Sequence, residues 1–588
     1  MSTLRSLSLG IGAVLCVGSA TLLSPATDAT AAARVTAAAT DFERAPPAVD
    51  AIHITSLGQQ TGGNALLALT YSKGQDLPTQ IPFNVGDTTV QLQQDPGNAQ
   101  RYSALIPFDF DGFVREQEQR QALAQSQATV PSFSSREFLG EATVQFLDPS
   151  ALRQQIAAGT PILVPGPVLP WPAALVRPER SLMITHPGVV DDPSRTFDAC
   201  TGTGNPNGAW TFNRMMTNMA NTPMTGVNPS DFVENWLRTW GTSTSINTFP
   251  VNQRAQVITQ VLNTWPRLSN GKLDLGNASA RLLAVSNRLD LRGNSAYGGG
   301  NAGELRFVFG LLRRSGTSCT TLPFTVILEY APVINGCPAV RNYAQRWGNL
   351  GTLALGSASY NAALQALTDP VIAANASPRK PNGSAINQIR TNEFLQNPWE
   401  LREFKIVQGS PLLKIVPAAQ TPHHSHNNTA LLAHYINNQA PQILAGTYLL
   451  PLSYAIPPNP PQPFQTGSVI NPSPQQVWNG PGAGNNPRNR FSLNTCDACH
   501  GRETQTTSFL HVAPRAIGAQ AALSRFLIGN GTLAAPTTYT IPDPVSGTPR
   551  TYGDLLRRQA DLAALQSSAC LSGGLLHEAT SSPLLATH

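Results

Sequence analysis

The sequence predicts a multidomain α+β protein with an N-terminal β-sandwich-like domain, a central α+β domain with an antiparallel sheet, and a mostly helical C-terminal segment. The chain has 588 residues, which is too long for one ordinary hydrophobic core. Charged residues make up only 12% of it, beside 49 Pro and 47 Gly, and this composition favours loop-rich, strand-containing structure over long helices. Two proline-rich stretches, 161–178 and 456–489, are expected to be linkers between the three parts.

Residues 1–33 have the features of a secretory signal peptide. A short basic start precedes an apolar run from Leu7 to Leu23, and the small residues from Ala26 to Ala33 suit cleavage. The apolar run is short for a membrane span of about 20 residues. Leu15 stands before Cys16, where a lipoprotein site has a small residue. We therefore expect a periplasmic or secreted protein with no integral membrane segment after cleavage.

Residues 45–150 contain short alternating runs broken by Gly, Asn and Pro, the pattern of an immunoglobulin-like β-sandwich. Nothing in this domain looks catalytic, and such modules usually bind other molecules or act as spacers between domains. The predicted strands are Ala65–Tyr71, Thr88–Gln93, Tyr102–Phe108 and Glu141–Phe146, with a polar helix or insert over Arg115–Gln127.

Residues 180–455 mix helical and strand patterns and predict the central α+β domain. Helical apolar spacing occurs at Phe212–Ala220, Ser230–Trp240, Val251–Trp265, Val340–Leu350, Tyr360–Leu367 and Ala385–Phe394. Strands are predicted at Arg281–Leu291, Glu304–Phe309, Phe324–Tyr330 and Trp399–Ile406. Because no helix separates the first three strands, they should form an antiparallel meander.

Charged side chains share one face of these predicted strands. The ordinary interpretation is a salt-bridged solvent face, and the alternative is the floor of a charged cleft covered by the loop 293–303. Acidic and Asn side chains there could bind Ca²⁺, but their spacing does not match an EF-hand loop, so calcium stays unsupported. The residues are Arg288, Asp290, Arg292, Glu304 and Arg306, with Glu329, Glu400 and Arg402 as an extension of the same face.

A histidine cluster precedes the end of this region. His423, His424 and His426 could ligate a metal, joined by His434 if the following helix folds back. The alternative is a polar loop that caps the helix beginning near Asn428.

The C-terminal segment, residues 490–588, contains the motif Cys496-Asp497-Ala498-Cys499-His500. Two thiols three residues apart with a histidine directly after the second are typical of a c-type haem attachment site. We expect Cys496 and Cys499 to add to the two vinyl groups of one covalent haem c, with His500 as the proximal iron ligand. A zinc half-site or a redox dithiol would compete in a reducing compartment, whereas bacteria attach haem c outside the cytoplasm.

The distal ligand departs from the ordinary cytochrome c pattern, because the last methionine in the chain is Met224. A downstream Met ligand is therefore excluded. His511 is the nearest candidate, and its alternative role is to fix a turn before Pro514. Lesser candidates are His577, the histidine loop at 423–426, and a Met from 183–224; the site could also be open. Bis-His ligation closes the iron to substrate, whereas an open site allows peroxide or oxygen chemistry.

Two helices, Ala516–Ile528 and Tyr552–Gln566, with the loop Gly531–Pro549 between them, are predicted after the motif. Cysteines outside the signal peptide and the motif number four, enough for two disulfides in an oxidising compartment. Cys319 and Cys337 lie close together around a strand-like run, so we expect them to pair. Cys200 with Cys570 follows by elimination.

Several runs resemble a group of uncharacterised secreted bacterial proteins, of the myxobacterial type, that have a single C-terminal Cys-x-x-Cys-His. The likeness covers roughly residues 180–570 and not the N-terminal domain; it implies a cytochrome c-like haem segment and no known activity. General cytochrome c similarity reaches only Cys496, Cys499 and His500. The runs are Ser181–Thr185, Asp192–Asp198, Arg281–Arg292, Asn301–Phe309, Trp399–Phe404, Arg490–Gly501, Glu503-Thr504 and Phe509–Arg515.

Three functions remain open. The first is an extracytoplasmic monohaem c-type protein that binds haem and transfers electrons to an unknown redox partner. The second is a haem-dependent peroxidase- or oxygenase-like enzyme with an open distal site, although di-haem peroxidases carry two motifs and this chain has one. The third is a non-haem secreted binding protein with a Cys496–Cys499 disulfide. A net charge of +5 with scattered basic residues argues against nucleic-acid binding, and ordinary hydrolase motifs are absent, so catalytic residues stay unassigned.

Overall fold

The computed structural model describes residues 49–566, except 58–63, 72–78, 86–87, 108–109, 111–113, 115–148, 164–175, 293–301, 316–317, 335–336, 446–447, 472–476 and 507–509. The chain forms two compact units. The N-terminal unit contains residues up to Leu175 with 336–345 and 563–578, and the central unit contains Val176–Asn335 and Arg346–Leu562. The predicted signal peptide, Arg115–Gln127, Glu141–Phe146, Cys570 and His577 lie outside the described residues.

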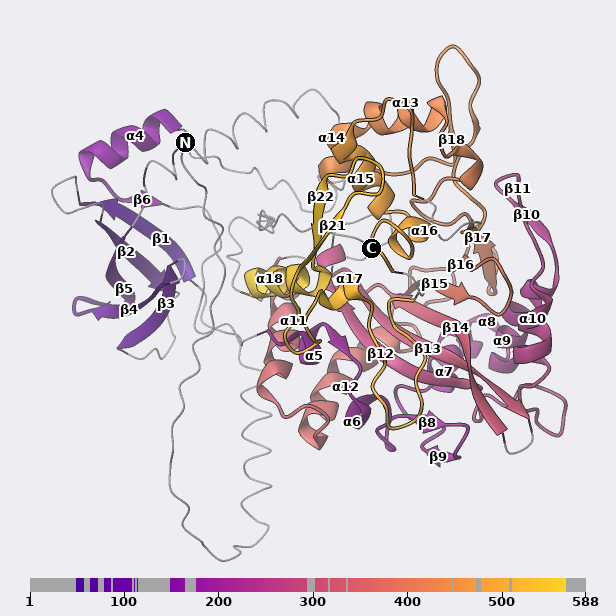
Figure 1. The fold of residues 1–588 in the computed structure, drawn as a ribbon. Helices are drawn as coiled ribbons and strands as arrows, with labels where there is room; N and C mark the ends of the chain where they lie inside the picture. Colours follow the sequence, from indigo (N-terminus) through magenta and orange to yellow (C-terminus); the bar gives the residue numbers. More distant parts are fainter. Residues whose placement is uncertain are drawn as a thin grey trace, which may run out of the picture. The chain divides into compact units, whose positions relative to one another are not determined.

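The N-terminal unit contains a six-stranded antiparallel sheet in the order β3-β4-β5-β2-β1-β6 (Figure 1). Buried Leu67, Leu69 and Tyr102 belong to its core. The three predicted strands that fall on described residues are confirmed, but those residues form one sheet and show no second sheet facing it. The elements are β1 (Val49–Ser56), β2 (Asn64–Tyr71), β3 (Gln80–Val85), β4 (Thr88–Asp95), β5 (Asn98–Pro107), β6 (Ile162–Leu163) and α4 (Pro149–Ala158).

The central unit is built on an antiparallel sheet in the order β17-β16-β15-β14-β13-β12-β7, with β20 also paired to β16. The predicted meander is confirmed, because β13 pairs with both β12 and β14 in antiparallel register. The strands are β7 (Met183–Ile184), β12 (Ala280–Arg288), β13 (Glu304–Ser315), β14 (Ser318–Tyr330), β15 (Ile386–Glu393), β16 (Glu400–Ile406), β17 (Leu413–Val416) and β20 (Val469–Ile470).

The predicted helix over Ala385–Phe394 is wrong, because this segment forms β15. Its backbone pairs with β14 on one side and with β16 on the other. Gln388, Arg390 and Asn392 alternate with Ile389 and Thr391, so the run also has a two-residue period. Pairing with two neighbouring strands decides the conformation of such a short segment over local propensity.

Helices cover one face of this sheet (Figure 1). Phe212 of α7 packs edge-on against Phe309 of β13 at 5.4 Å between ring centroids, and Trp236 of α9 packs against Phe404 of β16 at 5.9 Å. Thr211 and Asn228 cap the two helices, whose predicted positions are confirmed. The elements before the meander are α5 (Pro178–Ser181), α6 (Pro187–Val190), β8 (Phe197–Asp198), β9 (Thr203–Gly204), α7 (Phe212–Ala220), α8 (Thr222–Thr225), α9 (Pro229–Arg238), β10 (Thr244–Ile246), β11 (Phe249–Val251), α10 (Ala255–Val257) and the π-helix η3 (Ile258–Leu262).

Later elements include α11 (Cys337–Asn349) and α12 (Ala358–Ile372), which confirm the helices predicted at Val340–Leu350 and Tyr360–Leu367. The helix predicted over Val251–Trp265 is shorter, since Val251 ends strand β11.

The C-terminal elements lie over the other face of the sheet (Figure 1). The helix predicted over Ala516–Ile528 forms only in its last turn, α17. The residues before it form a loop in which the Ala513 amide donates to the Ala522 carbonyl, with Gly518 at a positive φ of 73°. The elements are α13 (Ala430–Asn438), α14 (Ala440–Ala445), β18 (Ser453–Tyr454), β19 (Gln462–Pro463), α15 (Asn485–Leu493), α16 (Cys496–Cys499), α17 (Arg525–Ile528), the hairpin β21 (Tyr539–Pro542) with β22 (Pro549–Tyr552), and α18 (Asp554–Gln566).

The stretch 456–489, predicted as a linker, contributes to the core of the central unit. Trp478 is fully buried in a cluster with Phe464, Tyr435 and Phe491. Strand β20 follows Phe464 and pairs with β16 of the main sheet.

The charged strand face is buried, so its interpretation as a solvent face is wrong. Glu304 and Glu329 are each 1% exposed and Arg390 is 2% exposed. C-terminal residues, among them Phe526 and Arg558, lie close to Glu329 and Arg390. The register places Arg390 opposite Glu403, whereas Glu400 and Arg402 lie on the opposite, helix-covered face. Most of the loop predicted to cover this floor, 293–301, lies outside the described residues.

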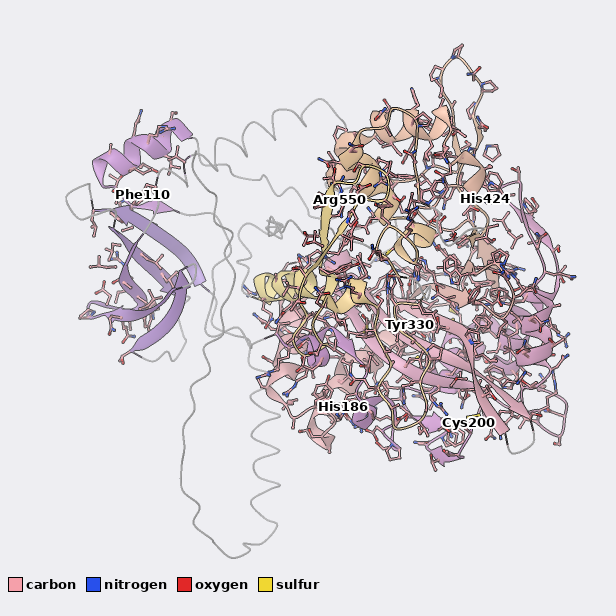
Figure 2. All side chains as sticks on the ribbon, viewed as in Figure 1. Phe110, His186, Cys200, Tyr330, His424 and Arg550 are labelled. Carbon is pink, nitrogen blue, oxygen red and sulfur yellow. A yellow bond between two sulfur atoms is a disulfide. The ribbon has the colours of Figure 1, made fainter. Side chains whose placement is uncertain are left out.

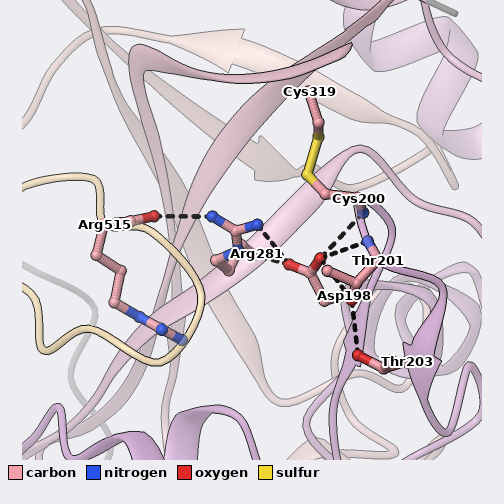
Figure 3. Close-up of a disulfide and its surroundings, with 7 residues drawn as sticks. All are labelled: Asp198, Cys200, Thr201, Thr203, Arg281, Cys319 and Arg515. Carbon is pink, nitrogen blue, oxygen red and sulfur yellow. Dashed lines mark hydrogen bonds and ion pairs between the residues drawn. A yellow bond between two sulfur atoms is a disulfide. The ribbon is translucent and has the colours of Figure 1, made fainter. Parts of the chain in front are cut away.

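The predicted disulfide pairs are also wrong. Cys319 of β14 is bonded to Cys200, which excludes both Cys319 with Cys337 and Cys200 with Cys570 (Figure 3). Sequence proximity misleads here, because folding brings the β8–β9 turn, 119 residues away, next to the start of β14. Among the described residues, no helix combines the length and the apolar character needed to cross a membrane.

Candidate haem-binding site

The motif forms one short helical turn, α16, in the core of the central unit. The His500 amide donates to the Cys496 carbonyl at 2.9 Å, and the Cys499 amide donates to the Thr495 carbonyl at 3.1 Å. Cys496 is 0% and Cys499 is 3% exposed, and neither thiol is disulfide-bonded. Both thiols and the imidazole of His500 are thus brought together in one buried place.

The turn is fixed from both sides. Cys496 packs in an apolar cluster that includes Trp399 and Leu401, and its amide donates to the Thr421 hydroxyl at 3.1 Å. The Trp478 indole donates to the Asp497 carboxyl at 2.8 Å. Burial raises the pKa of this carboxyl to about 6. The position of the two sulfurs therefore depends on packing against the main sheet and against the 456–489 stretch.

The electrostatic setting keeps both sulfurs protonated. Burial raises the pKa of the Cys496 thiol to about 11, and burial, followed by the nearby Asp554 carboxylate, raises the pKa of Cys499 well above its usual value. Redox-active dithiols and zinc sites use thiolates, which a lowered pKa favours. The raised pKa values of Cys496 and Cys499 therefore argue against a redox dithiol and against a zinc half-site.

The structure places His511, the predicted distal ligand, beside His500. The two ring centroids lie 4.2 Å apart, and Nε2 of His511 lies 3.5 Å from Sγ of Cys499. The other ring nitrogen, Nδ1, lies 2.8 Å from the Ser524 hydroxyl. Burial first, then the positive charges of His500 and two arginines, lowers the pKa of His511 well below its usual value. The result is a half-buried, neutral imidazole whose Nε2 faces the motif.

The loop that carries His511 is anchored to the sheet by Arg515. Its guanidinium forms an ion pair with Asp191 at 2.6 Å and donates to the Leu282 carbonyl at 2.7 Å. The Arg515 carbonyl accepts a hydrogen bond from Arg281, which pairs in turn with Asp198 beside the disulfide (Figure 3). This network connects the His511 loop with strand β12 and the β8–β9 turn.

A cavity of about 80 Å³ lies between these two histidines and the charged face of the sheet. This enclosed volume is below the range of about 300–1,000 Å³ that is usual for ligand pockets. Its charged lining residues are Arg288, Arg306, Arg390, Arg558 and Glu329. Its apolar lining residues are Met183, Val308, Ile327, Leu401, Val512, Phe526 and Leu527.

These residues fit a c-type haem. Two thiols that are not disulfide-bonded, a histidine directly after them and a second histidine beside the first are the protein ligands such a group needs. The apolar wall suits the macrocycle, and Trp399 stacks on His500 with ring centroids 5.5 Å apart. The rings of His500 and His511 are in contact, so they would have to separate for both to bind one haem iron.

Met183 lines the same cavity, so one methionine of the 183–224 stretch lies within reach of the site. The histidine loop makes its described contacts elsewhere. His423 stacks on Phe249 with centroids 3.9 Å apart, and Nε2 of His426 lies 2.9 Å from the Pro463 carbonyl. Helix α13 is capped by Thr429, as in the polar-loop interpretation. Figure 2 labels His424 in this loop and Tyr330 on the sheet.

Within the described ranges, no three or more His, Cys, Asp or Glu side chains are arranged to bind a bare metal ion. Neither the histidine loop nor the acidic residues of the sheet therefore supplies such a site. The haem interpretation does not require one, because the porphyrin supplies four of the iron ligands.

Sequence reasoning missed Ser524, Trp399 and Arg558. Nothing in the local sequence distinguishes Ser524 or Arg558, since each reaches the site only through the fold.

Comparisons with known proteins give no relative: no protein-family model, no curated protein and no solved structure matches this chain.

Proposed function

We propose that this protein is an extracytoplasmic monohaem c-type haem protein that transfers electrons. Cys496 and Cys499 would hold the haem covalently, with His500 as the proximal and His511 as the distal iron ligand. The observation that carries the proposal is the position of His511, 4.2 Å from His500 with Nε2 toward the motif. Haem bound in this way supplies a one-electron couple between ferric and ferrous iron.

The chain's own residues account for the other requirements of a carrier. Ser524 fixes the ring orientation of His511, and Trp399 packs on His500. Apolar side chains form part of the cavity wall beside the two histidines. A second axial histidine closes the iron to substrate, which favours electron transfer over catalysis.

The two other functions have less support. A peroxidase- or oxygenase-like enzyme requires an open distal position, whereas His511 lies beside His500. A Cys496–Cys499 disulfide protein requires a bond that the two sulfurs do not make. Met183 in the cavity is the specific observation that keeps His/Met ligation as a second arrangement for the same function.

The test is expression in a bacterial host with a cytochrome c maturation system, followed by the pyridine haemochrome assay and visible spectra. We expect covalent haem and a low-spin ferric spectrum in the wild type. His511→Ala should become high-spin and bind cyanide, whereas the matched control Met183→Leu should keep the low-spin spectrum. Wild-type protein without covalent haem would contradict the proposal.

Two other spectroscopic results would favour one of the alternative functions or ligand sets. A high-spin wild-type spectrum that His511→Ala leaves unchanged favours the enzyme. A low-spin spectrum lost in Met183→Leu but kept in His511→Ala favours His/Met ligation.

We also propose export with removal of a signal peptide and, from the haem-attachment motif alone, a cytochrome c-like character for the C-terminal segment. Protein recovered from the periplasm or medium of the host should begin after the small residues 26–33, which N-terminal sequencing measures. Mature protein that still carries Leu7–Leu23 would contradict export with cleavage.

A further inference from the structure

Lys380 lies in the turn before β15 and extends its amine toward the first residues of that strand. Its Nζ lies 2.9 Å from Oδ1 of Asn387, and 3.2 and 2.8 Å from the carbonyls of Ala385 and Ile386. The turn fixes the backbone of Lys380, because the Gly383 amide donates to its carbonyl at 3.0 Å. A lysine amine is therefore held against a side-chain carboxamide.

An irregularity of β15 presents Asn387 to this amine. Ile386 and Gln388 lie opposite consecutive residues of β14, so Asn387 is the extra residue of a β-bulge. A bulge re-aims a side chain, and bulges are frequent beside reactive sites. Nδ2 of Asn387 donates to Oε1 of Glu304 at 3.4 Å, and Glu304 is 1% exposed. The carboxamide thus contacts an amine at its oxygen and a buried carboxyl at its nitrogen.

The surroundings favour the neutral forms of the amine and of the carboxyl. Burial lowers the pKa of Lys380 to about 8, although the charge of Glu304 opposes this change. Burial raises the pKa of Glu304, against the effect of Arg306, whose guanidinium donates to Oε2 at 2.6 Å. A neutral amine is the nucleophilic form of lysine, and a protonated carboxyl can donate a proton.

The contacts of Lys380 also direct its lone pair. An ammonium group has three hydrogens, whereas a neutral amine has two, enough for the carbonyls of Ala385 and Ile386. The lone pair then faces the carboxamide of Asn387. Cγ is one carbonyl bond from Oδ1, so Nζ lies within about 4 Å of this carbon. Holding two reacting groups at such a distance replaces a bimolecular encounter and greatly raises the rate of their reaction.

We propose that Lys380 and Asn387 become joined by an intramolecular isopeptide bond, with Glu304 as the proton donor. Nζ attacks Cγ, the Nζ–Cγ amide bond forms, and the Cγ–Nδ2 bond breaks. Nδ2 leaves as ammonia with the proton of Glu304, and the proton that Nζ loses restores the carboxyl. The reaction needs no oxidant and no further reactant. It is independent of haem, because none of the three residues lines the cavity beside the motif.

Peptide mass mapping of the wild-type chain, denatured and digested with trypsin, tests the bond. Trypsin cleaves after Arg379 and Arg390 but not before Pro381, so residues 380–390 form one peptide that contains both partners. We expect this peptide to be lighter than its linear form by one ammonia. Backbone fragmentation should be suppressed between the two linked residues. A peptide with the full linear mass overturns the inference.

A variant without the amine separates this bond from the other reaction that could release ammonia in the same peptide. Asn382 precedes Gly383, and such a pair can form a succinimide with the same loss of mass. Lys380→Arg keeps the positive charge but has no lysine amine, and its peptide has the same ends. We expect the full mass of the linear peptide in this variant. A loss of ammonia that persists in Lys380→Arg overturns the inference.

A pair of variants tests the part of Glu304. Glu304→Gln should prevent the bond, because the carboxamide of Gln cannot supply the proton. Glu329→Gln is the matched control, since Glu329 is equally buried but accepts a hydrogen bond from Gln388. We expect the cross-linked peptide in Glu329→Gln and the linear peptide in Glu304→Gln. Equal cross-linking in the two variants overturns the role of Glu304 as the proton donor.

Discussion

Nδ1 of His511 lies 2.8 Å from the hydroxyl of Ser524, and the Ser524 amide donates to the His511 carbonyl at 3.0 Å. The two residues thus close the base of one loop through side chain and backbone together. Because Nδ1 is engaged, Nε2 is the nitrogen that faces Cys499. Histidines that ligate metals ordinarily have such a partner on the other ring nitrogen, which fixes the ring orientation.

Ser524→Ala should loosen the distal ligand without removing it. Loss of such a supporting hydrogen bond typically weakens a metal–ligand interaction by about 10- to 100-fold. We expect cyanide to bind the ferric variant about 10- to 100-fold more tightly than the wild type, because it competes with a less firmly held His511. Spectroscopic titration with cyanide measures this, and Ser524→Thr, which retains the hydroxyl, serves as control. Equal cyanide affinity in the alanine variant and the wild type would show that Ser524 does not position the ligand.

Arg515→Met should destabilise the central unit. Arg515 is 4% exposed, and removing one partner of a buried ion pair leaves the other unpaired, at about 3–5 kcal/mol. The free energy of unfolding in urea measures the effect. Arg238→Met is the matched control, since Arg238 and Glu234 form a surface pair worth about 0.3–0.5 kcal/mol. Similar losses in the two variants would mean that Arg515 is not an anchor of the His511 loop.

The disulfide makes two predictions, one for the wild type and one for a variant without it. Peptide mapping under non-reducing conditions should recover a peptide that links Cys200 to Cys319. Replacing both cysteines by Ser should lower the free energy of unfolding by about 2–5 kcal/mol, the usual range for a bridge that closes a long loop. A linked peptide that joins Cys319 to Cys337 instead would refute the pairing.

Local patterns predicted the centre of the site. The spacing of Cys496, Cys499 and His500 requires only one helical turn, and α16 supplies it. His511 was identified because it lies close to His500 in sequence. The meander of β12, β13 and β14 followed from three strand-like runs with no helix between them.

The other features of the fold and the site depend on contacts that local patterns do not show. The pairing of Cys200 with Cys319 and the approach of Arg558 to the cavity join residues far apart in sequence. A strand pattern shows which side chains share a face but not what covers that face. The charged face with Glu329 and Arg390 was therefore assigned to solvent, whereas the fold buries it.

Glu393, at the end of β15, is a fully buried carboxyl that gives the fold a specific pH dependence. Burial raises its pKa to about 7, against the opposing effect of Arg254, whose guanidinium lies 3.4 Å away. The amides of Leu395 and Gln396 donate to its Oε1 at 2.6 and 3.2 Å. Between pH 4.5 and 7 the unfolded chain has lost this proton while the folded protein retains it. The contribution of Glu393 to the free energy of unfolding therefore falls as the pH rises through that window.

Glu393→Gln should remove this dependence. The pKa rises from 4.5 to about 7 on folding, so the variant should gain about 3 kcal/mol relative to the wild type between pH 4.5 and 7. Urea unfolding at several pH values measures the difference. Glu234→Gln is the control with opposite sign, since hydrogen bonding to Arg267 lowers the pKa of Glu234. That variant should lose stability relative to the wild type as the pH rises through 4.5. Parallel stability curves for wild type and Glu393→Gln would show that the carboxyl is already ionised in the fold at pH 5.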